Sequence, residues 1–376
     1  MSLPNDLIPP EFAAKVIDLA CAIQAVPAPT FQEGQRAAYF LKQFQSLGLV
    51  DVQEDAAGNV LGRLPGSGSS ARPLVVSAHM DTVHPLGTPL GVRRAEDRII
   101  GPGIGDNALG LAALLGLVQH LQRNRIQLPG DLWLVANTGE EGLGDLRGMQ
   151  EVVNRFGGKP LAYIVLEGMG LGTVLNRGLG VERYKITVNT PGGHSWVDYG
   201  QPSAIHELCG LVANLTRLSV PQSPCTTMNV GIIHGGTSVN TIAAQAWLEL
   251  DLRSEEGAVL ARLAGDVQKL AGQAQRPGVN VRVERIGKRL AGHLPEHHPL
   301  ITLARSVLEE LGLEPRLDIA STDANLPLSR GYPAVCVGIT HGNNAHTAEE
   351  FILTGPVAKG LAQLYLFVTR AWEKMA

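Results

Sequence analysis

The chain of 376 residues is 44% hydrophobic and 18% charged, and its formal net charge at pH 7 is −4. This length favours two domains, and a mild negative charge without a basic stripe argues against a nucleic-acid partner. The 44 glycines and 23 prolines suit a turn-rich α/β protein better than a helical bundle. The four cysteines are far apart and form no CxxC pair, so free thiols and a cytoplasmic location are expected.

Two segments bear on secretion and membranes. Residues 1–10 lack a basic stretch followed by an apolar one, so they do not resemble a secretory signal. The longest apolar run, residues 109–118, is too short to cross a bilayer and contains Gly110 and Gly116. This run predicts a buried core helix, and no contact with a membrane is expected.

Helices and strands alternate in the first part of the chain. In chain order, helices are predicted over 10–25, 32–47 and 109–121, and strands over 50–60, 62–64, 74–78, 132–136 and 163–166. Thr30 and Glu33 have the spacing of a capping box at the start of the second helix. Apolar strands that alternate with helices favour an α/β fold, with a mainly parallel sheet flanked by helices.

Polar residues that can bind a metal stand directly after these strands. His79 and Asp81 follow the strand over 74–78, and two residues apart on an extended chain they share one face, so that Asp81 can hold the far nitrogen of the imidazole. The pair Glu140 and Glu141 follows the next strand, and Glu167 the one after it. Functional groups gather at the carboxyl ends of parallel strands, so we expect these side chains to meet.

The pattern changes near Gly180. A strand–helix–strand–strand–helix–strand order is predicted, with strands over 181–189, 227–233, 244–253 and 280–286 and helices over 203–217 and 258–274. This order suggests a small antiparallel sheet with two helices. The larger pattern then resumes, with helices over 300–311 and 356–372 and a strand over 334–338. We therefore predict a catalytic domain formed by residues 1–179 and 290–376, with a smaller α+β domain, residues 180–289, inserted into it.

Two histidines and several carboxylates describe a mixed nitrogen and oxygen metal site. Besides the groups above, Asp106 precedes the helix over 109–121, and His346 lies in the segment that follows the strand over 334–338. Five ligands with one bridging carboxylate can hold two divalent ions, which clamp a water, lower its pKa and polarise a carbonyl. A spare carboxylate beside them can act as general base.

These motifs, in this order, resemble the metallopeptidase superfamily that contains peptidase T, carboxypeptidase G, acetylornithine deacetylase, succinyl-diaminopimelate desuccinylase and aminoacylase. The resemblance runs through almost the whole chain. Its catalytic motifs are residues 77–83, 105–110, 138–142 and 167–168, and His346-Thr347 with Glu350. Its markers in the inserted domain are Gly193-His194, residues 235–240 and residues 251–253. The resemblance implies a zinc-exopeptidase type of catalytic domain with an inserted lid or dimerisation domain.

The resemblance also implies a set of metal ligands. Asp106 bridges two divalent ions, His79 and Glu167 complete one site, and Glu141 and His346 complete the other. His341 competes with His346 for the last position, but the His-Thr-x-x-Glu context decides for His346. Zn²⁺ is the expected ion, with Co²⁺ or Mn²⁺ as alternatives. A strained, cis peptide bond is expected between Asp106 and Asn107.

The remaining roles are those of the family's catalytic and substrate-binding residues. Glu140 takes a proton from the bridging water and delivers it to the leaving amine, and Asp81 orients the first histidine ligand. His194 reaches the oxyanion from the lid, in dimeric relatives from the partner's lid. Asn240 and Arg253 hold a substrate carboxylate. Two simpler interpretations stay open: His194 as a turn histidine, and Arg253 as a structural partner of an acid such as Asp251.

The implied activity is that of a metal-dependent exopeptidase or amidohydrolase acting on short peptides, and a homodimer through the lid is expected. The run over 321–325 and the Glu167 motif resemble the peptidase T branch, which implies an aminopeptidase or tripeptidase. The alternatives are a carboxypeptidase G-like enzyme or an N-acyl amino acid deacylase. A further alternative, an inactive peptide-binding homologue, predicts a broken motif, and none of the motif residues is missing.

Overall fold

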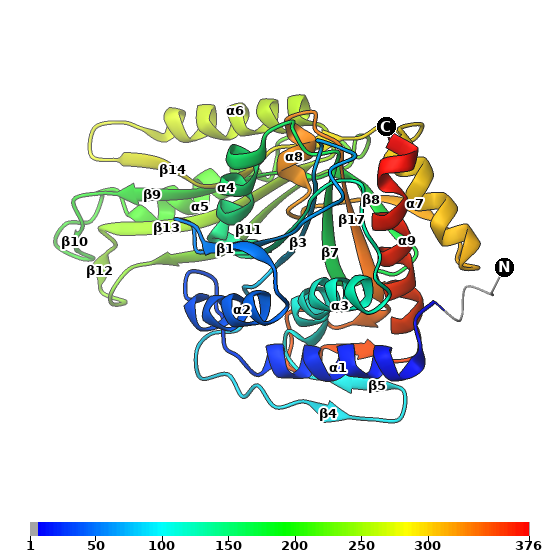
Figure 1. Ribbon diagram of the computed structural model, residues 1–376. Helices are drawn as coiled ribbons and strands as arrows, with labels where there is room; N and C mark the ends of the chain where they lie inside the picture. Colours follow the sequence, from blue (N-terminus) through cyan, green and yellow to red (C-terminus); the bar gives the residue numbers. More distant parts are fainter. Residues whose placement is uncertain (1–6, 376) are drawn as a thin grey trace. The chain divides into compact units, whose positions relative to one another are not determined.

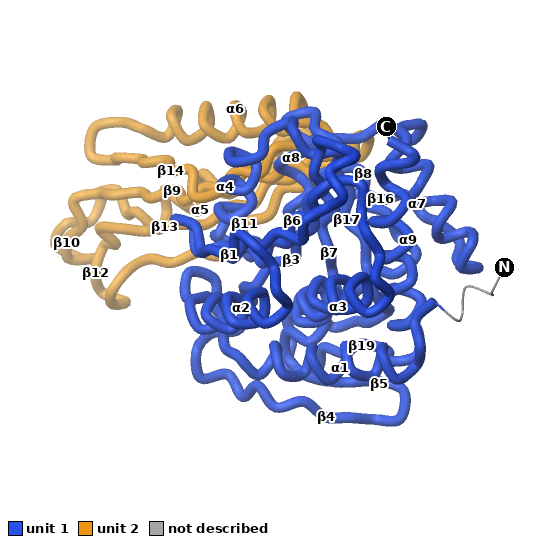
Figure 2. Tube along the Cα trace, in the orientation of Figure 1, with its two compact units in different colours: residues 1–178, 292–376 blue, residues 179–291 orange. Residues whose placement is uncertain are grey.

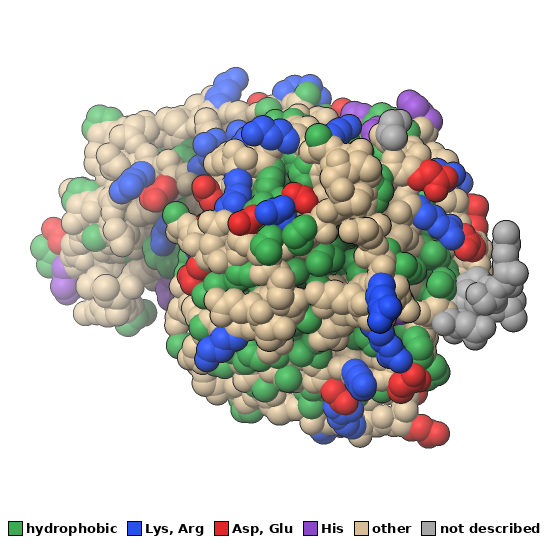
Figure 3. Space-filling view, viewed as in Figure 1, with side chains coloured by type: hydrophobic (Ala, Val, Ile, Leu, Met, Phe, Trp, Pro, Cys, Tyr) green, Lys and Arg blue, Asp and Glu red, His purple; other side chains and the backbone are tan. Residues whose placement is uncertain are grey.

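The computed structural model describes residues 7–375 (Figure 1). The chain divides into two compact units (Figure 2). Unit 1 comprises the chain up to Gly178 and from Gly292 onward, and unit 2 comprises Leu179–Ala291. On the face drawn in Figure 3, acidic and basic side chains lie interspersed, and no stripe of one sign crosses it.

Unit 1 is built on a large mixed sheet. Its strands are β1 (Val50–Glu54), β2 (Val60–Leu64), β3 (Leu74–His79), β6 (Leu132–Asn137), β7 (Tyr163–Met169), β8 (Thr173–Gly178), β15 (Gly292–His293), β16 (Arg316–Ala320) and β17 (Ala334–Thr340). They follow the order β1-β2-β6-β3-β7-β17-β8-β15, with β16 beside β8. The central strands β6, β3, β7 and β17 are parallel. The predicted α/β class, with a mainly parallel sheet flanked by helices, is confirmed.

The helices of unit 1 are α1 (Pro10–Gln24), α2 (Gly34–Ser46), α3 (Leu109–Arg123), α4 (Arg147–Phe156), α7 (Pro299–Glu310), α8 (Asn325–Ser329) and α9 (Val357–Met375). Helix α3 packs on β3 and β7 and against α1 and α9 (Figure 1). The segment Ile104–Arg123 is long and apolar enough to cross a membrane by length and composition, but 89% of its most apolar window is buried within the protein. A helix that is apolar all round belongs in a core, and the predicted core helix is confirmed.

A second, small sheet lies at the carboxyl ends of the central strands. It consists of β4 (Arg93–Arg94), β5 (Arg98–Ile100), β18 (Gly342–Asn343) and β19 (Phe351–Leu353), in the order β18-β19-β5-β4. The pairing of β5 with β19 brings together two segments that lie about 250 positions apart in the sequence. This sheet therefore joins the loop before Asp106 to the loop after His346.

The predicted capping box at the start of α2 is wrong. The helix begins at Gly34, and its N-cap residue Glu33 makes no side-chain cap hydrogen bond. Thr30 instead donates a hydrogen bond to Asp81, and Glu33 accepts one from the Gly139 amide. Both side chains therefore bind groups distant in the sequence instead of the amides at the helix terminus.

Unit 2 is a four-stranded antiparallel sheet with two helices. Its strands are β9 (Gly180–Asn189), β11 (Thr226–Gly235), β13 (Gln245–Ser254) and β14 (Asn280–Arg289), in the order β11-β13-β9-β14, and its helices are α5 (Ala204–Leu215) and α6 (Gly257–Ala274). Leucines of both helices form a core with the apolar residues of β9 and β13. A short ribbon pairs β10 (Gly193–His194) with β12 (Thr241–Ile242). The predicted strand–helix–strand–strand–helix–strand order is confirmed.

Candidate metal centre

His79 ends β3, the strand between β6 and β7 in the sheet, and its side chain is 1% exposed. Its Nδ1 lies 3.1 Å from the backbone oxygen of Asp81 and 3.5 Å from Oδ1 of the same residue. Two oxygens on that side favour a proton on Nδ1, which leaves the Nε2 lone pair free to bind a metal. Nε2 faces Asp106 Oδ1 at 3.0 Å and Glu167 Oε2 at 3.7 Å.

The register of the parallel strands explains why Glu167 meets His79. Val165 pairs with Ser77, so two residues further along each strand Glu167 and His79 stand at the same level. Both side chains point to the same face, because side chains alternate with period 2. The sheet therefore converts two separate strand-end motifs into neighbours.

Asp106 lies between the two histidines of the site. Its Oδ1 is 3.0 Å from His79 Nε2, and its Oδ2 is 3.2 Å from His346 Nε2. Glu141 Oε1 lies 3.4 Å from the same nitrogen of His346. Each oxygen of Asp106 thus faces a different histidine, which is the arrangement that a bridging carboxylate requires. The peptide bond that follows Asp106 is cis, as predicted.

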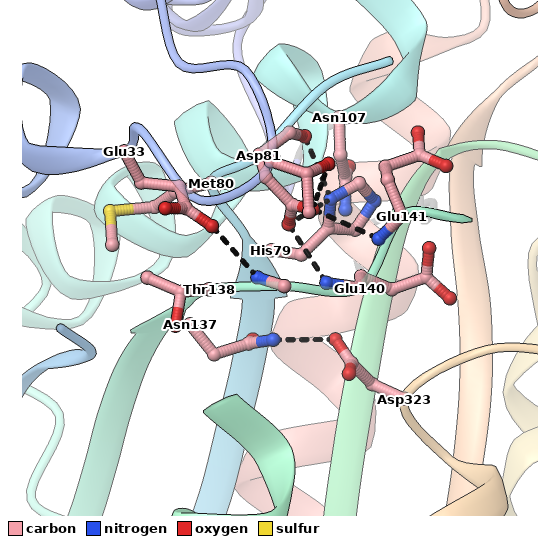
Figure 4. Close-up of polar contacts among 12 residues, drawn as sticks. Glu33, His79, Met80, Asp81, Asn107, Asn137, Thr138, Glu140, Glu141 and Asp323 are labelled. Carbon is pink, nitrogen blue, oxygen red and sulfur yellow. Dashed lines mark hydrogen bonds and ion pairs between the residues drawn. The ribbon is translucent and has the colours of Figure 1, made fainter. Parts of the chain in front are cut away.

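Asp81 holds both the first histidine and the acidic pair. Its Oδ1 and Oδ2 accept hydrogen bonds from the Glu140 and Glu141 amides, each at 2.9 Å (Figure 4). The Thr30 hydroxyl adds a third at 3.0 Å. Burial raises the pKa of Asp81, but the hydrogen bonds from His79 and these amides outweigh it and keep the pKa below its usual value. The residue is therefore an anion that fixes the backbone positions of Glu140 and Glu141.

The site is short of positive charge. Hydrogen bonds to Asp106 and Glu141 raise the pKa of His346 to about 10, and burial raises that of Glu167 to about 7. Burial also raises the pKa of Asp106, but hydrogen bonds from His346 and His79 outweigh it and bring the pKa well below its usual value. Without a metal, protons on the histidines supply positive charge beside these carboxylates, and bound cations would reduce the repulsion between the carboxylates.

The donor set fits divalent ions. His79, Asp106 and Glu141 offer ligand atoms that all lie within 4.8 Å of one another. Two imidazole nitrogens and three carboxylates form the mixed set that suits Zn²⁺ and similar ions. Of the predicted residues in unit 1, the structure brings together the five predicted ligands, Asp81 and the backbone of Glu140.

Several supporting residues were not predicted from the sequence. Arg36 is fully buried, and its guanidinium donates to the backbone oxygens of Met80, at 2.6 Å, and Val26, at 2.7 Å. Asn137 donates to Asp323 at 2.6 Å beside Glu140 (Figure 4). The only sequence signal for Arg36 was a charged residue among the apolar positions of a predicted helix.

In unit 2, His194 and Asn240 lie close together. His194 pairs with Thr241 across the β10–β12 ribbon, and the Ser195 amide donates to the backbone oxygen of Asn240 at 3.1 Å. The Trp196 amide donates to His194 Nδ1 at 3.2 Å. In the neutral imidazole the proton then resides on Nε2, which can donate a hydrogen bond.

Arg253 lies apart from these two residues. It stands eight positions beyond the start of β13, roughly 26 Å along an extended strand. Its Nε is 2.7 Å from Asp251 Oδ1, and Arg183 Nε is 2.9 Å from Oδ2 of the same carboxylate. The structure therefore gives Arg253 the acidic partner that the sequence offered as the simpler interpretation.

Comparison with known proteins identifies a family. Residues 75–370 match the family model for Peptidase family M20/M25/M40. An acetylornithine deacetylase of Edwardsiella ictaluri is 25% identical over 320 residues, which cover 79% of this chain and 79% of that protein. Two solved structures share the fold. An aminopeptidase PepT from Bacillus cereus has a TM-score of 0.79 at 19% identity, over 97% of this chain and 100% of the other. A tripeptidase from Staphylococcus aureus has a TM-score of 0.82 at 20% identity, over 98% and 100%.

Proposed function

The chain belongs to Peptidase family M20/M25/M40, and from this premise we propose that it is a dimetal hydrolase that cleaves an amide bond in short peptides, as an aminopeptidase or tripeptidase. The order of its motifs predicted both this family and a hydrolase. The observation that carries the proposal is the position of Asp106, whose two carboxylate oxygens face two different histidines.

The proposed ligands divide into two sets that share one residue. His79, Asp106 and Glu167 would hold one ion, and Asp106, Glu141 and His346 the other. When bound, two such ions polarise the amide carbonyl and supply a water that is acidic enough to react near neutral pH. We propose Zn²⁺ as the native ion, and the same donors accept Co²⁺ or Mn²⁺.

The proposed proton carrier is Glu140. Its side chain accepts a proton from the attacking water and returns it to the nitrogen of the leaving amine, so that the amide bond breaks without an unstable amide anion. Its backbone amide is fixed by Asp81, and the residue is 7% exposed, so the carboxylate has little freedom to move away.

The proposed substrate contacts come from unit 2. His194 offers an Nε2–H donor to the oxyanion, because backbone amides already occupy its Nδ1. Asn240 lies beside it and can hold the substrate. Arg253 remains a candidate for a substrate carboxylate, since its side chain is 41% exposed although Asp251 binds it.

We further propose a cytoplasmic homodimer that forms through unit 2. Strand β11 is an edge strand of its sheet, and edge strands offer unpaired backbone groups to a second chain. Three apolar side chains near His194 are strongly exposed: Trp196 (86%), Tyr199 (90%) and Val239 (103%). Such a patch fits a surface that a partner covers. The four free cysteines favour a reducing compartment.

A second candidate is an N-acyl amino acid deacylase. It is favoured by the sequence similarity to an acetylornithine deacetylase, whereas the two solved structures above, an aminopeptidase and a tripeptidase, favour a peptidase. A panel of di- and tripeptides, N-acyl amino acids and folyl-glutamate-like compounds, with added Zn²⁺, Co²⁺ or Mn²⁺, separates them. We expect tripeptides to give the highest kcat/KM. Preference for N-acyl amino acids would support the deacylase, preference for folyl-glutamates the carboxypeptidase G-like enzyme, and no hydrolysis at full metal loading an inactive homologue.

A further inference from the structure

A buried carboxylate binds the backbone of the turn that carries Asp106. Glu350 is 0% exposed. Its Oε1 accepts hydrogen bonds from the amides of Gly105 at 2.7 Å and Asp106 at 2.8 Å, and its Oε2 accepts one from Gly103 at 3.1 Å. Among residues 7–375, Glu350 forms no ion pair with a lysine or arginine. Burial raises the pKa of Glu350 to about 7, and the hydrogen bonds from these three amides favour its charged form.

The same residue belongs to the loop that carries His346. Glu350 lies four positions after His346 and directly before β19, which pairs with β5. Its backbone oxygen accepts a hydrogen bond from the Gly101 amide at 2.8 Å. The strand pairing and the side chain together join residues 98–106 to residues 346–353. Two proposed ligands that are 240 positions apart in the sequence therefore depend on one junction.

The turn before Asp106 carries few side chains, and besides Glu350 it is held by the Gln24 side chain, which donates to the Pro102 backbone oxygen at 2.9 Å, and by the buried Ile104. Its sequence, Gly101-Pro102-Gly103-Ile104-Gly105, offers a single large side chain. Gly103 has a φ of 72°, a conformation that favours glycine, and a Cβ on Gly105 would lie 2.8 Å from the Met169 side chain, which would have to shift. The Glu350 carboxylate supplements this packing, and it is bound to the Asp106 amide itself.

We propose that Glu350 is a positioning residue that holds Asp106 and His346 in register, so that both halves of the metal centre assemble together. The proposal rests on the proposed dimetal function. Since Asp106 is shared by both halves, loss of Glu350 should weaken both sites rather than one.

The test measures binding of Co²⁺ to the metal-free full-length protein by its visible absorption, which does not depend on activity. Glu350→Gln places an amide NH₂ opposite backbone N–H groups, and we expect both Co²⁺ affinities to fall roughly 10- to 100-fold, as for other residues that support metal ligands. Glu349→Gln is the matched control. Its side chain is exposed and binds Arg93 instead of the amides of the turn, so the Co²⁺ affinities of this variant should equal those of the wild type.

Activity supplies the second measurement. Saturating Co²⁺ should restore most of the kcat of Glu350→Gln with little change in KM. Unchanged Co²⁺ affinities in this variant, or an effect on one site alone, would overturn the proposal. If Glu350→Gln does not fold, Glu350→Asp keeps the charge with a shorter reach. It should then show a smaller loss at both sites, and wild-type affinities in it would equally overturn the proposal.

The two proposals fail in different ways. A wild-type protein that binds two Co²⁺ ions but hydrolyses no amide would refute the proposed function. The Co²⁺ affinities of the variants would still test the positioning role of Glu350. A wild-type protein that binds fewer than two ions would refute the dimetal site. It would also refute the role of Glu350 in joining two metal sites.

Discussion

Gly168→Ala is a one-methyl change that should damage the metal centre. Gly168 follows the proposed ligand Glu167 on β7, and a Cβ added there would lie 2.2 Å from the backbone oxygen of Gly105 and 2.9 Å from Leu109 Cβ. Ordinary contact begins near 3.4 Å. The contacting atom is a backbone oxygen and cannot rotate away as a side chain could. The turn that carries Asp106 must therefore shift by about 1 Å.

The size of the effect follows from this displacement. A misplacement of about 1 Å in a catalytic constellation can cost about 10²-fold in rate, or about 2.7 kcal/mol of transition-state stabilisation. Because Asp106 would move away from Glu167, its partner in one proposed half of the site, the affinity for metal should fall as well. Overpacking of the core should add a loss of stability of about 1–3 kcal/mol.

The assay compares Gly168→Ala with Gly355→Ala. A Cβ at Gly355, also in unit 1, meets no atom within 4 Å, so that variant should behave as the wild type. We would measure Co²⁺ affinity, kcat/KM on the best tripeptide and the circular dichroism spectrum. A folded Gly168→Ala protein with metal affinity and kcat/KM within about threefold of the control would refute the claim that this close approach sets the geometry of the site.

Three further predictions concern the roles of individual groups. Glu140→Gln should keep both ions but lose about 10²-fold or more in kcat, whereas Glu141→Gln should lose bound metal; the reverse pattern in metal analysis would exchange their roles. His194→Ala should lower kcat without changing metal content, and an unchanged kcat would make it a turn residue. Metal binding at pH 7 should release protons, because the pKa of His346 is raised to about 10 in the metal-free site. Affinity should therefore fall as the pH falls, and calorimetry in two buffers with different ionisation enthalpies should detect the protons; equal heats in the two buffers would contradict this.

Local signals in the sequence were sufficient for the strand-end motifs. A buried apolar strand followed at once by His-x-Asp or Glu-Glu places polar groups at the edge of a sheet, whatever the rest of the fold. The spacing of His79 and Asp81 already indicated which side of the imidazole would be supported, and the distances agree. The cis bond after Asp106, in contrast, came only from the family resemblance.

Local signals failed where a side chain had a distant partner. Thr30 and Glu33 have the spacing of a capping box, yet they bind Asp81 and the Gly139 amide. The geometry of a helix terminus is a weak preference, of about 1 kcal/mol, and a buried acceptor elsewhere can outweigh it. Arg36 shows the same limit. A charged residue in a helix predicts a solvent-exposed side chain unless the carbonyl groups that it binds are known.

The sequence by itself determined the fold class, the main order of elements in unit 2, the family and the residue types gathered for a metal centre, because these follow from periodicity and from short motifs. Only the tertiary structure decided which groups touch. The register of β3 and β7 set Glu167 beside His79, and the pairing of β5 with β19 brought Glu350 to the Asp106 turn. Such contacts depend on strand register and on segments hundreds of positions apart, and no local pattern records either of them.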